Sequence, residues 1–154
     1  MRFPVLLLLG LVQPAVAYAM TPQAPSTVTA VFEHYGLFGE WAVHCEAQAS
    51  PSNPHVLVMR PADDTVLEKH ELGAGYTVNT YRMLTAEPVS PTRIAVEALF
   101  QPDGKDGQRQ RLVFSVRART RRTVFTQIDG GPVRVKNGMA VGYGVKTPRL
   151  EKCG

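Results

Sequence analysis

From Trp41 onward, the sequence consists of short runs rich in β-branched and aromatic residues, separated by clusters of proline, glycine and aspartate. The turn-forming clusters are SPSNP, PADD, GAG, EPVSP, PDGKDG and DGGP. They recur at intervals of roughly 10 residues, which is typical of an all-β protein. The predicted strands cover residues 40–46, 55–60, 65–72, 76–84, 93–100, 109–118, 122–129, 132–136 and 139–145.

Short links between successive strands predict an antiparallel meander of eight or nine strands. Such a meander either closes into a small barrel or splits into a two-sheet sandwich. Closure removes unpaired strand edges, so we favour the barrel. The alternation of inward and outward side chains is clearest in TRIAVEALF and RQRLVFSVRAR, which we predict to pair.

The dipeptide Asn137-Gly138 has the composition of a two-residue hairpin turn. That register sets Lys136 opposite Met139 and so pairs a polar position with an apolar one. We therefore expect a bulge or a longer loop at this point.

The segment before Trp41 predicts one short amphipathic helix over residues 27–35. Its apolar residues fall at helical spacing: Val28, Val31, Phe32 and Tyr35. Ser26 or Thr27 provides the N-cap, and Gly36 ends the helix. The expected fold is all-β with one N-terminal helix.

The first 17 residues have the layout of a secretory signal peptide. Arg2 supplies the positive charge, residues 3–12 form an apolar core, and Ala15-Val16-Ala17 matches a cleavage site. A membrane-spanning helix needs roughly 20 apolar residues, and no stretch of the sequence reaches that length. We expect an exported protein, periplasmic or secreted, that does not span the membrane.

The rest of the chain divides into a leader and one domain. Residues 18–26 are polar and proline-bearing, which is typical of a flexible leader, and residues 27–154 have the size of a single β-barrel domain. The sequence contains two cysteines, and two cysteines in an oxidising compartment are expected to pair. A disulfide between Cys45 and Cys153 would tie the two ends of the domain together.

Three motifs resemble known families. The helix followed by Gly39-Glu40-Trp41 resembles the start of a lipocalin, which implies a barrel whose tryptophan packs against a late arginine, here Arg149 or Arg134. FGEWAVHCE is similar to the strand opening of the exported invasion-associated locus B proteins, although the further cysteines of that family are missing. Residues 38–55 and the end TPRLEKCG resemble small exported bacterial β-proteins of unassigned function, which share a Trp-x-x-x-Cys strand, a Ser-Pro-x-Asn-Pro loop and a terminal cysteine. This third resemblance also implies that the two cysteines pair.

Composition and motifs do not indicate nucleic-acid binding, catalysis or a metal. The formal net charge of +4 is too small to indicate a nucleic-acid partner. No serine lies in a glycine-flanked elbow and no phosphate-binding loop is visible, so we expect no enzyme, no catalytic residue and no cofactor. His44, Glu46 and His55 could form a two-nitrogen, one-carboxylate group, but ordinary surface roles fit them better and we assign no metal site.

Arginines gather in RQRLVFSVRARTRR and form a candidate site for an anionic partner: Arg109, Arg111, Arg117, Arg119, Arg121 and Arg122. The first four take the outward positions that the inward apolar residues leave free. Their guanidinium groups suit lipopolysaccharide phosphates, anionic lipid heads or an acidic protein. The alternative is a solvated outer face that protects the strand from aggregation.

The barrel interior is the other candidate site. Its predicted lining residues are Val96, Phe100, Phe114, Val116 and Tyr143. The same residues would also fill a solid core, since eight-stranded barrels range from filled to hollow. We favour a non-catalytic binding protein that holds a small apolar or amphipathic ligand. The alternative function is an envelope interaction or inhibitor protein that acts through the arginine hairpin and rigid loops.

Overall fold

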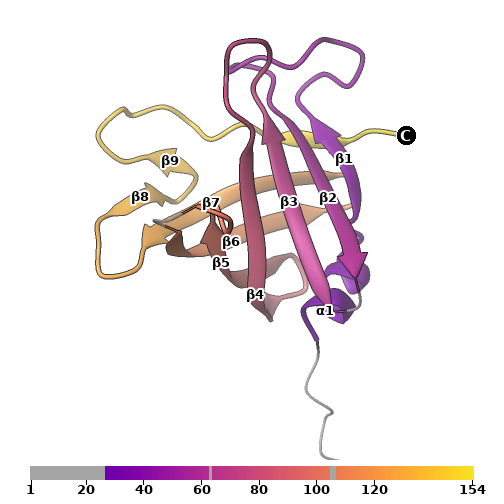
Figure 1. Ribbon diagram of the computed structural model, residues 1–154, viewed down its shortest axis with the longest axis vertical. Coiled ribbons are helices and arrows are strands. Elements are labelled where there is room, and N and C mark those ends of the chain that lie inside the picture. Colours follow the sequence, from indigo (N-terminus) through magenta and orange to yellow (C-terminus); the bar gives the residue numbers. More distant parts are fainter. Residues whose placement is uncertain (1–26, 63, 105–106) are drawn as a thin grey trace, which may run out of the picture.

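The alternating strands form a closed, eight-stranded antiparallel β-barrel with one short helix, as the sequence predicts (Figure 1). The structure is a computed structural model that describes residues 27–62, 64–104 and 107–154. The predicted signal peptide, residues 1–17, and leader, residues 18–26, lie outside the described residues.

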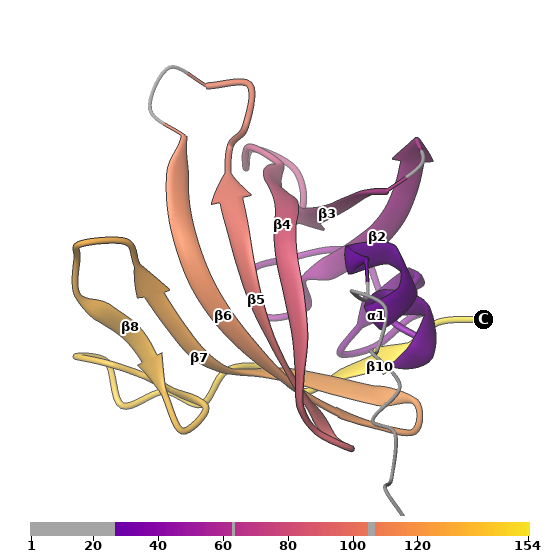
Figure 2. The same ribbon diagram turned by 90° about the horizontal axis from the view of Figure 1, so that it is seen from below.

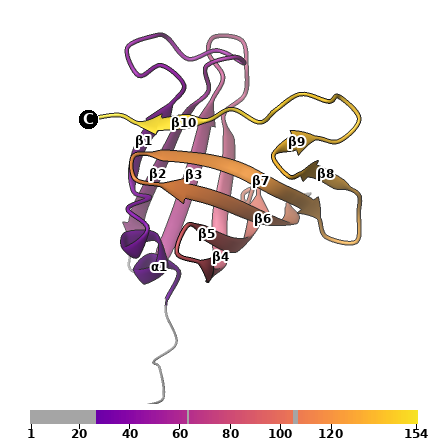
Figure 3. The same cartoon turned by 180° about the vertical axis from the view of Figure 1, so that it is seen from behind.

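The barrel strands follow one another around the ring in sequence order, except at the closure. The elements are α1 (Val28–His34), β1 (Gly39–Ala42), β2 (His55–Ala62), β3 (Thr65–Glu71), β4 (Asn79–Ser90), β5 (Arg93–Phe100), β6 (Gln108–Arg117), β7 (Thr120–Ile128), β8 (Val133–Lys136), β9 (Met139–Ala140) and β10 (Leu150–Lys152). The ring runs β10-β1-β2-β3-β4-β5-β6-β7, and β7 pairs with β10 to close it. β8 and β9 continue from β7 as an arm outside the ring (Figure 3).

The closure between β7 and β10 is short. It consists of two residue pairs, Leu150 with Arg121 and Glu151 with Thr120. Further along, the same edge of β7 pairs with β8, from residue 125 to residue 127. β10 and β8 therefore contact β7 at different heights, and the barrel wall has a seam between them.

The helix α1 lies at one end of the barrel (Figures 1 and 2). Its N-cap is Thr27, whose side-chain oxygen accepts a hydrogen bond from the Ala30 N–H at 3.1 Å. Val31 and Phe32 are buried in the barrel core together with Trp41. Among the described residues, no helix is long and apolar enough to cross a membrane.

The first strand is shorter than predicted, because a buried asparagine organises the loop that follows it. β1 ends at Ala42 instead of residue 46. The Asn53 side chain accepts a hydrogen bond from the His44 N–H and donates to backbone carbonyls of three loop residues, His44, Ala47 and Gln48. These bonds satisfy the buried amide and hold residues 44–48 out of the strand conformation.

The largest further differences from the predicted strands are in β4, β9 and β10. β4 runs to Ser90 through the EPVSP segment that was expected to be a turn. β9 is two residues long instead of covering 139–145. β10 was not predicted, because three residues are too few to show an alternation.

The hairpin between β8 and β9 contradicts the expected bulge. Lys136 pairs directly with Met139, and the two residues between them form the turn. Asn137 and Gly138 have φ angles of 51° and 72°, which a tight hairpin turn requires. The prediction was wrong because it assumed that each face of this short arm is uniformly polar or apolar.

A β-bulge in β7 changes which of its residues face outward. The pairing with β6 shifts from Val113–Phe125 to Phe114–Thr123, so Val124 has no partner on β6. A bulged residue interrupts the regular alternation of a strand. Val124 and Phe125 consequently lie on the same, outer face of the barrel.

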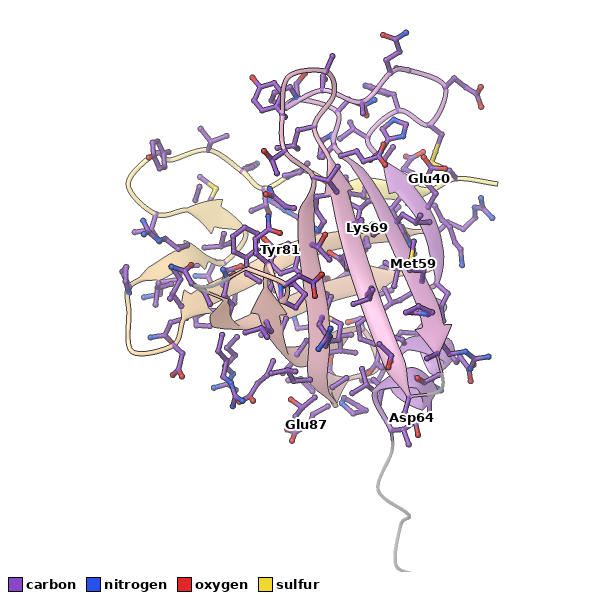
Figure 4. All side chains as sticks on the ribbon, viewed as in Figure 1. Glu40, Met59, Asp64, Lys69, Tyr81 and Glu87 are labelled. Atoms are coloured by element: carbon purple, nitrogen blue, oxygen red, sulfur yellow. A yellow bond between two sulfur atoms is a disulfide. The ribbon has the colours of Figure 1, made fainter. Side chains whose placement is uncertain are left out.

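The predicted disulfide between Cys45 and Cys153 is present, with a Cα–Cα distance of 5.5 Å. Figure 4 shows it as a yellow bond close to Glu40. Cys45 lies in the turn after β1 rather than on the strand, and Cys153 directly follows β10. Because β1 and β10 are paired, the disulfide fixes the strand pair that joins the two ends of the domain.

Candidate functional site

A buried ion pair crosses the barrel interior from β7 to β3. The two terminal guanidinium nitrogens of Arg121 donate to the carboxylate of Glu68 at 2.9–3.0 Å. Both side chains are only 2% exposed. A buried charge is costly without a partner, and here each partner neutralises the other with bidentate geometry.

Two aromatic rings contact the same guanidinium group. The Arg121 Cζ lies 4.5 Å from the ring centroid of Phe114 and 5.8 Å from that of Trp41. The lipocalin resemblance implied that Arg149 or Arg134 would pack against this tryptophan. Both of those arginines are exposed, and the structure places Arg121 there instead.

His70 and Tyr81 extend this polar group toward the barrel opening. The His70 Nε2 lies 2.6 Å from a carboxylate oxygen of Glu68. The Tyr81 ring lies 5.0 Å from the His70 ring, between ring centroids, and 5.0 Å from the Phe100 ring. Figure 4 shows Tyr81 on the side of β4 that faces the β8–β9 arm.

The buried charges fix the protonation of two of these groups at neutral pH. Burial alone would raise the pKa of Glu68, but attraction to Arg121 and the hydrogen bond from His70 outweigh it and lower the pKa to about 2. Burial, and then the negative charge of Glu68, raise the pKa of Tyr81 to about 12. Glu68 is therefore ionised and Tyr81 keeps its proton.

We expect the stability of the protein to fall as the pH is lowered from about 4.5 to about 2. The folded pKa of Glu68 lies below its ordinary value, so ionised Glu68 stabilises the fold fully above pH 4.5, and this contribution is lost as the pH falls toward 2. Urea unfolding across this range measures the loss. In Glu68→Gln the same range should show a shallower slope, whereas Glu33→Gln, which removes an exposed ion pair with Arg60, should keep the steep slope.

A cavity of about 230 Å³ opens over Arg121 and His70 at the seam of the barrel. Its apolar lining residues are Pro54, Val56, Leu112, Val135, Pro148 and Leu150. Its polar lining residues are His70, Tyr81, Arg121, Thr123, Thr126 and Thr147. Leu150 belongs to β10 and Val135 to β8, so the cavity lies beside β7 where one partner strand ends and the next begins.

The polar lining offers hydrogen-bonding groups beside an ion pair, Arg121 with Glu68, whose two charges balance. Because ionised Glu68 is an acceptor only, the His70 Nε2 donates the proton of their hydrogen bond. The protonated Tyr81 hydroxyl is a donor. The cavity can therefore hold a small molecule with an apolar body and a neutral polar end.

The five residues predicted to line a ligand site do not line this cavity. Val96, Phe114 and Val116 face inward as expected but belong to the filled core. Phe100 packs against Tyr81 at the cavity's edge. Tyr143 is a correction: it is 83% exposed, because β9 ends at residue 140 and the following segment leaves the barrel.

The six predicted arginines separate into two groups. Arg109, Arg111, Arg117 and Arg119 are exposed, as expected for the outer face. Arg121 is a correction, because it pairs with Val116 across the hairpin and so faces inward with it. Arg122 is a second correction, because it is half-buried and its guanidinium donates to Thr147 Oγ1 and to the Gly138 carbonyl.

The histidine group considered for a metal is not assembled. His55 is hydrogen-bonded through Nδ1 to Glu40 and through Nε2 to the Ala47 carbonyl. His44 is exposed in the loop after β1. In the part of the chain that the structure describes, no group of three or more histidine, cysteine, aspartate or glutamate side chains could hold a metal ion.

Neither Glu68 nor His70 was predicted as a site residue, although the sequence contains a signal for both. In the strand TVLEKHE the alternation puts Val66, Glu68 and His70 on one face. Since Val66 is apolar, that face is the inward one, and an acidic residue at an inward position requires a buried partner.

No family model, curated protein or solved structure matches the chain.

Proposed function

We propose that this chain is an exported, non-catalytic binding protein that holds one small amphipathic molecule in the barrel cavity. The observation that carries the proposal is the cavity, which combines apolar walls with a polar floor at the barrel seam. Barrels of eight strands are wide enough to hold one small ligand. The disulfide and the predicted signal peptide support export, because disulfides persist in oxidising compartments.

The size of the cavity limits the ligand. Pockets for drug-sized molecules measure roughly 300–1,000 Å³. The cavity here measures about 230 Å³. The ligand is therefore smaller than a typical drug, on the order of one ring with short substituents.

The electrostatics of the floor favour a neutral ligand. Arg121 is already neutralised by Glu68 through three N–O contacts of 2.9–3.0 Å. A charged ligand would enter without a free counter-charge and would lose its hydration. A neutral hydroxyl or carbonyl can instead accept a hydrogen bond from the Tyr81 hydroxyl.

Native mass spectrometry of the protein purified from its exported compartment tests this function. We expect an extra mass that disappears on denaturation and identifies a small neutral molecule. A bare protein that also fails to take up any member of a panel of single-ring alcohols and phenols would contradict the proposal.

Filling the cavity is expected to weaken ligand binding strongly. Thr126 lines the cavity, so Thr126→Phe places a ring inside it, and the Kd for a probe such as 4-ethylphenol should rise roughly tenfold or more. The control is Gln127→Phe, because the next residue along β7 faces the outside. Calorimetric titration measures both variants. Equal binding by the two variants would place the probe outside the cavity and count against the proposal.

A further inference from the structure

The outer face of β5, β6 and β7 carries a second candidate site. We propose that it binds a single-chain amphiphile with a phosphate head. The head lies at Arg117 and Arg149, and the alkyl chain lies in an apolar groove over Val113, Val124 and Phe125. The groove shares no lining residue with the interior cavity, and Arg121 is the one residue that lines both that cavity and the pocket for the head.

The groove is open and has a volume of about 610 Å³. Its lining residues are Val89, Arg93, Arg111, Val113, Val124, Phe125 and Asn137. Two β-bulges produce its apolar surface: Val124 in β7 and Val89 in β4 each lack a partner on the neighbouring strand. Val89 is 60% exposed. Neighbouring apolar side chains on an outer face are a typical mark of a binding surface.

One wall of the groove is held in place by hydrogen bonds. Asn137, in the β8–β9 hairpin, forms this wall. The hairpin is tied to β7 because the Gly138 N–H donates to the Val124 carbonyl at 2.9 Å and Arg122 donates to the Gly138 carbonyl at 2.5 Å. A Cβ at Gly138 would lie 3.0 Å from the Arg122 guanidinium carbon, so glycine permits this close approach. The groove is therefore preformed, which lowers the entropic cost of binding.

A basic pocket of about 210 Å³ adjoins the groove. Its lining residues are Ser115, Arg117, Thr120, Arg121, Arg122 and Arg149. The guanidinium groups of Arg121 and Arg122 are engaged inside the protein. Arg117 and Arg149 are exposed, and neither forms an ion pair with any carboxylate among the residues described. Arg149 donates one hydrogen bond, to Thr120 Oγ1 at 3.4 Å, so both arginines keep donors for an external anion.

The strand register makes the pocket and the groove one continuous surface. Ser115 on β6 lies opposite Arg93 on β5, so a residue of the pocket neighbours a residue of the groove. Along β6, Arg117 and Val113 are four residues apart on the same face, which corresponds to roughly 13 Å. A molecule with its charged end at Arg117 thus reaches the apolar groove through an extended chain.

The two halves of the surface together select an amphiphile. Guanidinium groups bind phosphate through paired hydrogen bonds, which accounts for the head. A bare anion would leave the apolar groove uncovered, and a neutral apolar molecule would leave the arginines without a partner. An extended peptide would need a free strand edge, whereas here β6 is paired on both sides.

Calorimetric titration with dodecyl phosphate, below its micelle concentration, tests the proposal. We expect it to bind roughly tenfold or more tightly than either inorganic phosphate or dodecyl maltoside, and to bind more weakly as salt rises. If inorganic phosphate binds as tightly as dodecyl phosphate, the site is an anion site without a chain groove. If dodecyl maltoside binds as tightly, the arginines play no part. Either result overturns the proposal.

Paired variants assign the head to its arginines. Arg117→Gln with Arg149→Gln should weaken dodecyl phosphate binding roughly tenfold or more, since charge-assisted hydrogen bonds are lost. The control combines Arg82→Gln with Arg134→Gln, which removes two exposed arginines that line neither the pocket nor the groove. Equal affinities of the two double variants would overturn the assignment.

Two further variants locate the alkyl chain. Val124→Ser should weaken the binding of dodecyl phosphate, because the alkyl chain loses an apolar contact. It should leave the weak binding of inorganic phosphate unchanged. Thr126→Phe, which fills the interior cavity, should leave dodecyl phosphate binding unchanged. Loss of binding in Thr126→Phe would mean that the chain enters the barrel and would overturn the outer site, while the proposed interior function would still stand.

Discussion

Replacing Arg121 with methionine is expected to destabilise the protein by about 3–5 kcal/mol, because the ionised Glu68 carboxylate would remain buried without a partner. The two side chains are each 2% exposed, so bulk water solvates little of the carboxylate that has lost its partner. The variant also loses the contacts between the guanidinium and the rings of Phe114 and Trp41. Urea unfolding at neutral pH measures the effect.

A double variant separates the ion pair from the packing around it. Glu68→Leu combined with Arg121→Met removes both charges and keeps apolar volume on the two strands. We expect its free energy of unfolding to recover most of the loss, since replacing a buried pair by apolar residues is often neutral or stabilising. A double variant as unstable as Arg121→Met would show that the aromatic contacts, not the charge balance, dominate.

Replacing both cysteines with serine is expected to reduce the free energy of unfolding by about 4–5 kcal/mol in the chain-entropy model. The disulfide spans a sequence separation of 108 residues, so the loop that it closes in the unfolded chain is long. It also fixes β10 beside β1, and β10 supplies two of the contacts that close the barrel onto β7. The double variant should therefore lose stability, and the amides of β10 at the seam should lose their protection from hydrogen exchange.

Urea unfolding with and without a reductant measures the contribution of the disulfide. The reductant should bring the wild-type protein to the stability of the Cys45→Ser, Cys153→Ser variant and should not change the variant itself. Hydrogen exchange of the amides in β10 reports on the seam. A variant within about 1 kcal/mol of wild type would mean that strand pairing alone holds the barrel ends, contrary to the loop-entropy argument.

The stability of the ion pair and the binding properties of the cavity have one cause. Because Glu68 and Arg121 satisfy each other, the floor of the cavity is rigid and carries no net charge. The groups left for a ligand are Tyr81 and His70, which are half-buried, whereas the side chains of Glu68 and Arg121 are 2% exposed. The same pair therefore accounts for both the expected loss of stability and the proposed preference for a neutral ligand.

β7 contributes to both proposed sites because its bulge changes the alternation of its side chains. Thr123 and Thr126 face the cavity on either side of the bulge, although they are three residues apart. Val124 and Phe125, between them, both line the outer groove. A regular strand would send only one of these two residues outward, so the bulge enlarges the groove without closing the cavity.

The sequence alone determined the fold class and most of its helix and strand positions, because these depend on local interactions. The two-residue alternation in β5 and β6, the turn-forming clusters and the helical spacing before Trp41 depend only on neighbouring residues. They predicted the helix, the antiparallel meander and most of the strands. The pairing of the two cysteines followed from their number and the expected oxidising compartment.

The tertiary structure alone decided where the sites are, because they depend on contacts between distant strands. Arg121 was predicted to face an external partner, but the register with Val116 turns it inward to Glu68, 53 residues away. Tyr143 was predicted to line the interior, but β9 ends too early to hold it there. Neither the bulges nor the β7–β10 seam leaves a pattern in the sequence, since each is fixed by the partner strand.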